Sequence, residues 1–152
     1  MKAAFRGEIK SYFLSSREKE EAVEALKRLL AIREEILFAY VHGSFLDEGP
    51  FRDLDIAVYV TAGDLPTRRF TYEESLAREI MYQTGLPFPV DIRLLNEAPV
   101  GFRYHVFHGR LLLDRDPDLR IEMMVKVIAR YLDIEPVLHH HAREAFDSEA
   151  QS

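Results

Sequence analysis

The chain has 152 residues, 47% of them hydrophobic and 30% charged, with a net charge of −6 and no cysteine. This length and composition fit one globular domain and exclude a disordered chain. The acidic balance argues against direct binding to nucleic acid, and the lack of cysteine excludes disulfides and thiolate-bound metals. Because no apolar run approaches the roughly 20 residues of a membrane span and residues 1–7 lack a signal-peptide core, we expect a cytoplasmic protein without membrane contact.

The first elements are a helix and two strands. Ser15 and Glu18 form a capping-box pattern, and the apolar residues that follow at helical spacing predict a helix over 16–34. The next three segments are predicted in order as a buried strand, a loop or single helical turn, and a second strand: residues 36–41, 43–51 and 54–60.

A second capping-box pattern opens the middle of the chain. Thr71 and Glu74 predict the start of a helix that Gly85 ends. The three segments that follow are predicted as a third strand near a sheet edge, a short helix and a brief extended piece: residues 88–95, 99–108 and 109–113.

The last part of the chain is predicted to be helical. Asp116 caps a long helix with Pro117 in its first turn, and Pro136 should break it, leaving a final helix to about residue 146. The polar residues 147–152 are predicted to form a flexible tail. The sequence therefore predicts one α/β domain over 1–146, with a small mixed β-sheet and flanking helices in a core of about 16–114 and C-terminal helices over about 117–146.

The strongest candidate site lies between residues 41 and 58. Asp53 and Asp55 are two apart at the start of a predicted strand, so their side chains point to the same face. Paired carboxylates repel each other unless a cation compensates, and hard oxygen ligands suit Mg²⁺. The alternative is an ordinary polar pair at the mouth of a strand.

Three further residues fit the same site. Gly43 and Ser44 follow the preceding strand, where a glycine backbone and a hydroxyl could hold phosphates. Asp91 stands inside an apolar strand, which is costly unless the carboxylate is paired or metal-bound. If the two strands are neighbours, the three carboxylates could bind two metal ions about 4 Å apart for an in-line displacement. Asp91 would then accept the proton of the nucleophile, although it could instead be an edge-strand residue facing water.

Nearby basic residues have two interpretations each. Arg52 and Arg93 could meet a triphosphate or form ordinary surface ion pairs. His42, beside the Gly-Ser turn, and His105 and His108, on the short helix, are expected to be packing or surface residues.

Residues 41–58 resemble the signature of the DNA polymerase β-like nucleotidyltransferases, in which Gly-Ser is followed at short range by Asp-x-Asp. Residues 107–117 resemble the segment that leads into the last helix of the minimal nucleotidyltransferase (MNT) group, and the resemblance covers about 20–140. Within this pattern, Arg52 stands where the family commonly has serine, and residues 45–49 replace its usual loop.

The resemblance implies a function. It assigns catalysis and Mg²⁺ binding to Asp53, Asp55 and Asp91, and nucleotide binding to Gly43 and Ser44. Members of this kind are antitoxins that transfer AMP from ATP to a tyrosine of a HEPN ribonuclease toxin. Two alternatives stay open: a small-molecule nucleotidyltransferase of the aminoglycoside type, and an inactive MNT-fold antitoxin that acts by binding alone. Self-association is compatible with each.

Overall fold

The computed structural model describes residues 10–150, with the backbone alone for 134–150. In chain order its elements are α1 (Ser16–Ala31), β1 (Ile36–His42), η2 (Ser44–Leu46), β2 (Leu54–Val60), η3 (Ala62–Asp64), α2 (Arg69–Thr84), β3 (Val90–Leu94), α3 (Val100–Phe107), β4 (Arg110–Asp114) and α4 (Pro117–Ala150). Within the described residues, no helix combines the length and the apolarity that a membrane crossing demands.

The four strands form one mixed sheet in the order β3-β2-β1-β4. β1 runs antiparallel to β2 and β4, whereas β2 and β3 are parallel. A parallel pair requires a crossover connection, which α2 supplies. This topology confirms the predicted α/β class with a small mixed sheet.

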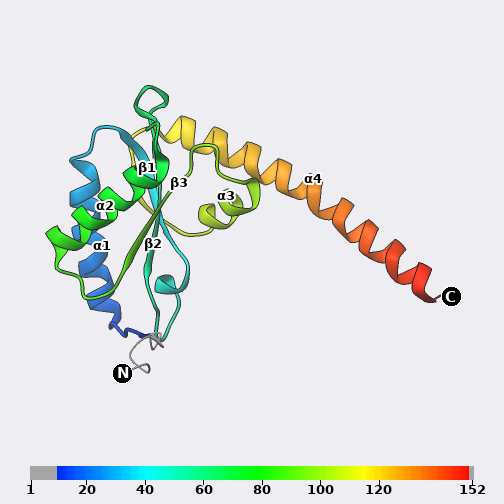
Figure 1. Ribbon diagram of the computed structural model, residues 1–152, viewed down its shortest axis with the longest axis horizontal. Coiled ribbons are helices and arrows are strands. Elements are labelled where there is room, and N and C mark those ends of the chain that lie inside the picture. Colours follow the sequence, from blue (N-terminus) through cyan, green and yellow to red (C-terminus); the bar gives the residue numbers. More distant parts are fainter. Residues whose placement is uncertain (1–9, 151–152) are drawn as a thin grey trace.

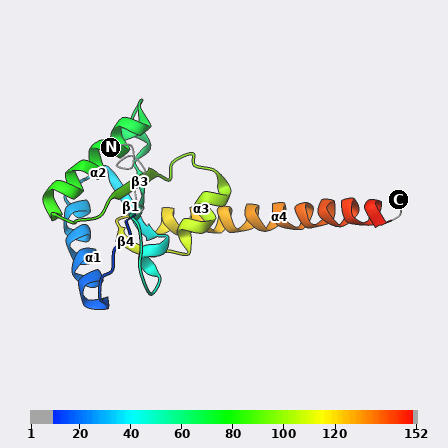
Figure 2. The same ribbon diagram turned by 60° about the horizontal axis from the view of Figure 1, so that its bottom comes forward.

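The two faces of the sheet are covered by different helices (Figure 1). α1 and α2 pack on one face, where the larger core cluster includes Leu26, Leu30, Leu76 and Ile80 from the helices. α3 and the start of α4 cover the other face, over a smaller cluster: Phe38, Tyr40, Ala57, Leu95 and Val106. Figure 2 shows that α4 then extends well beyond the rest of the fold.

Local capping signals are confirmed at three helix ends. The Ser15 hydroxyl accepts a hydrogen bond from the Glu18 amide at 3.2 Å, and the Glu18 carboxylate accepts one from the Ser15 amide at 3.0 Å. The carboxylate of Asp116 accepts a hydrogen bond from the Leu119 amide at 3.1 Å. Gly85 ends α2 in the left-handed conformation with φ of 64°.

Several predicted boundaries are wrong by a few residues. α2 begins at Arg69, and its N-cap Arg68 makes no side-chain capping bond, so the Thr71–Glu74 pattern lies inside the helix. Packing of an apolar helix face outweighs local propensity, which explains the earlier start. α1 ends three residues before the predicted end, and β3 is shorter than the predicted 88–95.

The predicted break at Pro136 is also wrong. α4 is one helix from Pro117 to Ala150. A proline removes one backbone donor and disturbs one turn, but the helix backbone continues on both sides of it. The first four residues of the predicted tail are therefore helical. The expectations for residues 1–7 and 151–152 lie outside the described residues.

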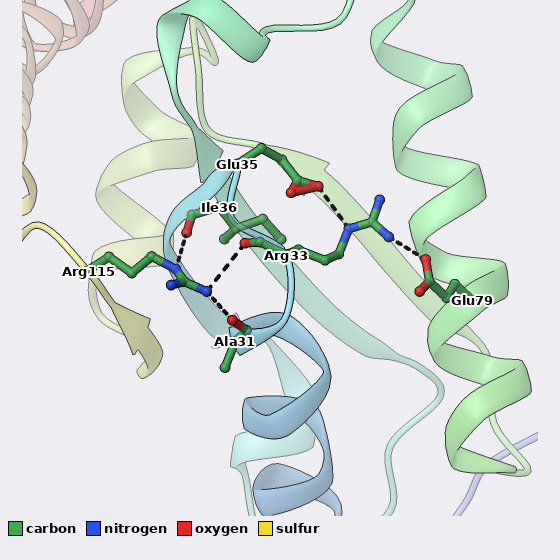
Figure 3. Close-up of polar contacts among 6 residues, drawn as sticks. All are labelled: Ala31, Arg33, Glu35, Ile36, Glu79 and Arg115. Atoms are coloured by element: carbon green, nitrogen blue, oxygen red, sulfur yellow. Dashed lines mark hydrogen bonds and ion pairs between the residues drawn. The ribbon is translucent and has the colours of Figure 1, made fainter.

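Arg115, between β4 and α4, forms hydrogen bonds that hold the α1–β1 connection in place (Figure 3). Its guanidinium donates to three backbone carbonyls of that connection, those of Ala31, Arg33 and Ile36. The Ala31 carbonyl lies in the last turn of α1, where carbonyls lack helical partners and a cation is favourable. The side chain of Arg33 in turn pairs with Glu35 and with Glu79 of α2. These contacts fix the start of β1, whose other end carries the candidate site.

Candidate active site

Three strands place His42, Asp55 and Asp91 in one row across the sheet. His42 is the register partner of Asp55, and Asp55 is the partner of Asp91. Side chains of paired residues project from the same face. The row therefore lies on the face covered by α3, and β2 and β3 are the neighbours that the predicted site required.

Asp53 and Asp55 are brought together at the start of β2. Burial raises the pKa of Asp55 to about 6. The negative charges of Asp53 and Asp91 add to the rise, as does a hydrogen bond that the protonated Asp55 carboxyl donates to Asp53. Arg93 opposes it. The structure thus gathers the predicted carboxylates closely enough for each to influence Asp55.

Asp91 lies at the edge of the sheet. Its carboxylate is 3.5 Å from the Arg93 guanidinium, and both side chains are about half-exposed. The solvent access of Asp91 therefore agrees with the alternative of an edge-strand residue that faces water. Asp91 nevertheless shares the row with Asp55. For Arg93 the surface ion pair is the observed arrangement, and Arg52 is exposed.

Gly43 is required by its conformation and by its neighbour. Its φ of 80° and ψ of −162° are essentially restricted to glycine. A Cβ at this position would lie 2.5 Å from Oδ2 of Asp55, so a larger residue would displace that carboxylate. The turn and the Asp-x-Asp strand are thus in direct contact.

The loop after Gly43 is held by aromatic packing. Ser44 is exposed and begins the single 3-10 turn η2, as the prediction of a loop or one helical turn allowed. Phe45 and Phe51 are buried, with ring centroids 5.1 Å apart in an edge-to-face arrangement. These two anchors explain how an unusual loop sequence still positions the Gly-Ser turn.

The chemistry of the donors fits Mg²⁺. Carboxylate oxygens are its preferred ligands, and the raised pKa of Asp55 reports a local excess of negative charge that a cation would relieve. However, the described residues contain no ready-made group of three His, Asp or Glu side chains that could hold an ion. Asp91 would have to turn from Arg93 toward the other two carboxylates.

Three histidines adjoin this site, although the sequence predicted them to be packing or surface residues and not part of it. His42 is buried, as expected for a packing residue, but its Nε2 has no hydrogen-bond partner among the described residues. Its ring meets those of Phe102 and His105 edge-to-face, with centroids 5.5 and 5.7 Å away. Burial, with His105 adding, lowers its pKa to about 4. The position of His42 directly before Gly-Ser was the available signal.

His105 in α3 and His108, the C-cap residue of that helix, are both exposed. Their spacing of three residues puts them on one helix face, which the sequence could have revealed. Together with His42 and Ser44 they line an open cavity beside the Gly-Ser turn.

Comparisons with known proteins agree with this geometry. The family model "Polymerase beta, Nucleotidyltransferase" matches residues 24–118. No curated protein matches the chain.

Solved structures with the same fold come from toxin–antitoxin complexes. One is a tri-AMPylated Shewanella oneidensis HEPN toxin in complex with MNT antitoxin, with 20% identity, 88% of this chain and 99% of that chain covered, and a TM-score of 0.60. Another is a toxin–antitoxin with AMP-PNP, with 21% identity, coverage of 86% and 98%, and a TM-score of 0.61. At these identities the likeness establishes the fold.

The matched family segment contains every residue of the predicted site, from Gly43 to Asp91. It also spans more than half of the chain and the complete four-stranded sheet. The chain therefore belongs to the polymerase β-type nucleotidyltransferase family.

Proposed function

We propose that this protein uses Mg²⁺ and ATP to transfer AMP to a tyrosine hydroxyl of a HEPN-type toxin, and so acts as its antitoxin. The observation that carries the proposal is the register of Asp55 with Asp91, beside Asp53 and in contact with Gly43. The toxin partner is supported by the complexes in which the structural neighbours occur.

Each site residue has a role in this reaction. Asp53 and Asp55 would hold Mg²⁺, which when bound supplies positive charge for the phosphates during in-line displacement. Gly43 would let the protein backbone approach the substrate phosphates closely, and the Ser44 hydroxyl would donate to a phosphate oxygen. Asp91 would accept the proton of the attacking hydroxyl, as the hydroxyl oxygen bonds to the α-phosphorus and pyrophosphate leaves.

The test is transfer of label from ATP to the toxin. The protein, Mg²⁺, ATP labelled at the α-phosphate and a HEPN partner are incubated, and the label is mapped on the toxin. Asp55→Asn and Asp91→Asn should each abolish transfer. Glu34→Gln removes one exposed carboxylate before the start of β1, at the end of that strand opposite the site, and should leave transfer intact. Undiminished transfer by Asp55→Asn would refute the assignment.

Antitoxin action by binding alone is the second candidate. It is favoured by the Asp91–Arg93 ion pair and by the lack of a ready-made metal group among the described residues. A stable complex with the toxin, without transfer of label in the presence of Mg²⁺, would support this alternative. Label on an aminoglycoside instead would indicate a small-molecule nucleotidyltransferase.

A further inference from the structure

An open cavity of about 430 Å³ lies beside the Gly-Ser turn, between η2 and α3. Its lining includes Ser44 and Asp47 from the turn, His42 from β1, and His105 and His108 from α3. Gly43, which touches Asp55, also lines the cavity, so the cavity adjoins the candidate site.

This cavity has few sources of positive charge. Of the described residues that line it, none is a lysine or an arginine, and Asp47 contributes a carboxylate. Two basic side chains nearby are engaged elsewhere. Lys19 Nζ donates to the Asp47 carbonyl at 2.7 Å and lies over aromatic rings of the loop, and Arg110 pairs with Glu20. Among the described side chains that line the cavity, only those of the histidines can therefore carry a positive charge.

The hydrogen bond of His108 decides which form can do so. Its Nδ1 lies 2.8 Å from the carbonyl oxygen of Tyr104. A carbonyl only accepts, so Nδ1 carries the hydrogen and the neutral ring has only a lone pair at Nε2. Only the doubly protonated ring can therefore donate from Nε2 to an anion in the cavity.

We propose that His105 and His108 bind the terminal phosphates of the nucleoside triphosphate, so that the cavity selects a polyphosphate over a monophosphate. This inference rests on the proposed function, and it adds the residues that recognise the leaving group. The two imidazoles lie three residues apart, on the last turn of α3 and at its C-cap, and both line the same cavity as Ser44. Charge-assisted hydrogen bonds from imidazolium groups suit phosphate oxygens.

Polyphosphate binding should consequently strengthen as the pH falls. The groups that face the two histidines are His42 from β1, Asp47 after η2, and Tyr104 on α3. Tyr131 of α4 stacks on Tyr104, with ring centroids 3.8 Å apart.

The experiment measures binding of inorganic tripolyphosphate and of AMP by calorimetry at pH 6 and pH 8, with the same Mg²⁺ concentration throughout. The double variant His105→Ala/His108→Ala should bind tripolyphosphate at least about tenfold more weakly than wild type at pH 6, with a smaller ratio at pH 8. AMP binding should change less than about twofold. Because the protonation of tripolyphosphate is the same in both experiments, the ratio of the variant and wild-type affinities reports the effect of the two histidines alone.

Two further variants provide controls. His105→Gln/His108→Gln keeps a neutral donor at each position and should fall between wild type and the alanine variant. Arg78→Gln removes a positive charge from an exposed side chain of α2 and should bind like wild type. Unchanged tripolyphosphate affinity in the alanine variant, or an equal loss for AMP, overturns the inference alone. If wild type binds neither tripolyphosphate nor ATP, the proposed function fails together with it.

Discussion

Replacement of Gly43 by alanine should separate backbone strain from damage to the site. Gly43→Ala forces a side chain into a backbone region that costs about 1–3 kcal/mol for other residues. In addition, the new Cβ would lie 2.5 Å from Oδ2 of Asp55, so the carboxylate must move. Gly49 is the matched control, because its φ of 95° is also left-handed while no atom lies within 4 Å of its Cβ position.

The two variants should therefore differ in activity more than in stability. We expect both to lower the free energy of unfolding by about 1–3 kcal/mol, measured by urea denaturation. Gly43→Ala should also reduce AMP transfer by on the order of a hundredfold or more, since a displacement of about 1 Å in a catalytic group has that effect. Gly49→Ala should retain transfer within a few-fold at a temperature where it is folded.

The result that would refute this reasoning is equal transfer by the two variants. Such a result would mean that the contact between Gly43 and Asp55 does not position the carboxylate. A loss of transfer in both, in proportion to unfolding, would likewise attribute the effect to stability.

Three more outcomes follow from the structure. Because the pKa of Asp55 is raised from 3.8 to about 6, its ionisation opposes folding, so wild type should lose stability as the pH rises from 4 to 6 and Asp55→Asn should lose less. The unfolding free energy of Asp55→Asn minus that of wild type should therefore be more positive at pH 8 than at pH 4, and a constant difference contradicts this. Asn96→Leu leaves the buried N–H and C=O of Val60 without their partners and should cost about 2–4 kcal/mol in urea denaturation, whereas a cost below about 1 kcal/mol would show that other groups replace them. Arg115→Met should lower the thermal midpoint by several degrees through loss of its bonds to three carbonyls, with partial rescue by Arg115→Lys; an unchanged midpoint would mean that water replaces them.

Features that depend on near neighbours in the sequence were predictable. The capping bonds of Ser15 and Asp116 join residues three apart, so the pattern contains both partners. The start of α2 was not predictable in this way, because Leu76 and Ile80 pack against strands far along the chain. The same limit applies at Pro136, where local propensity indicated a break and the helix continues.

The site shows the same division. The spacing of Asp53 and Asp55 fixes their shared face from sequence alone. The place of Asp91 depended on β2 and β3 being neighbours, a pairing that joins residues 36 positions apart. The histidines of α3 were missed because the docking of that helix on the sheet follows from apolar contacts, notably of the buried Val106. No local pattern specifies such contacts.

The candidate site concentrates unfavourable features at one end of the sheet. Asp55 is partly buried beside two like charges, Gly43 has a conformation restricted to glycine, and the buried His42 Nε2 has no partner among the described residues. Such features persist only where the surrounding structure imposes them, and here the continuous apolar core beneath β1 and β2 does so. A cation would relieve the charge repulsion, because it brings the opposite charge to Asp55, and a polyphosphate bound to that cation would occupy the cavity beside it. Binding of Mg²⁺ and a nucleotide analogue should therefore raise the unfolding temperature of wild type, and should do so less in Asp55→Asn, where that repulsion is already absent.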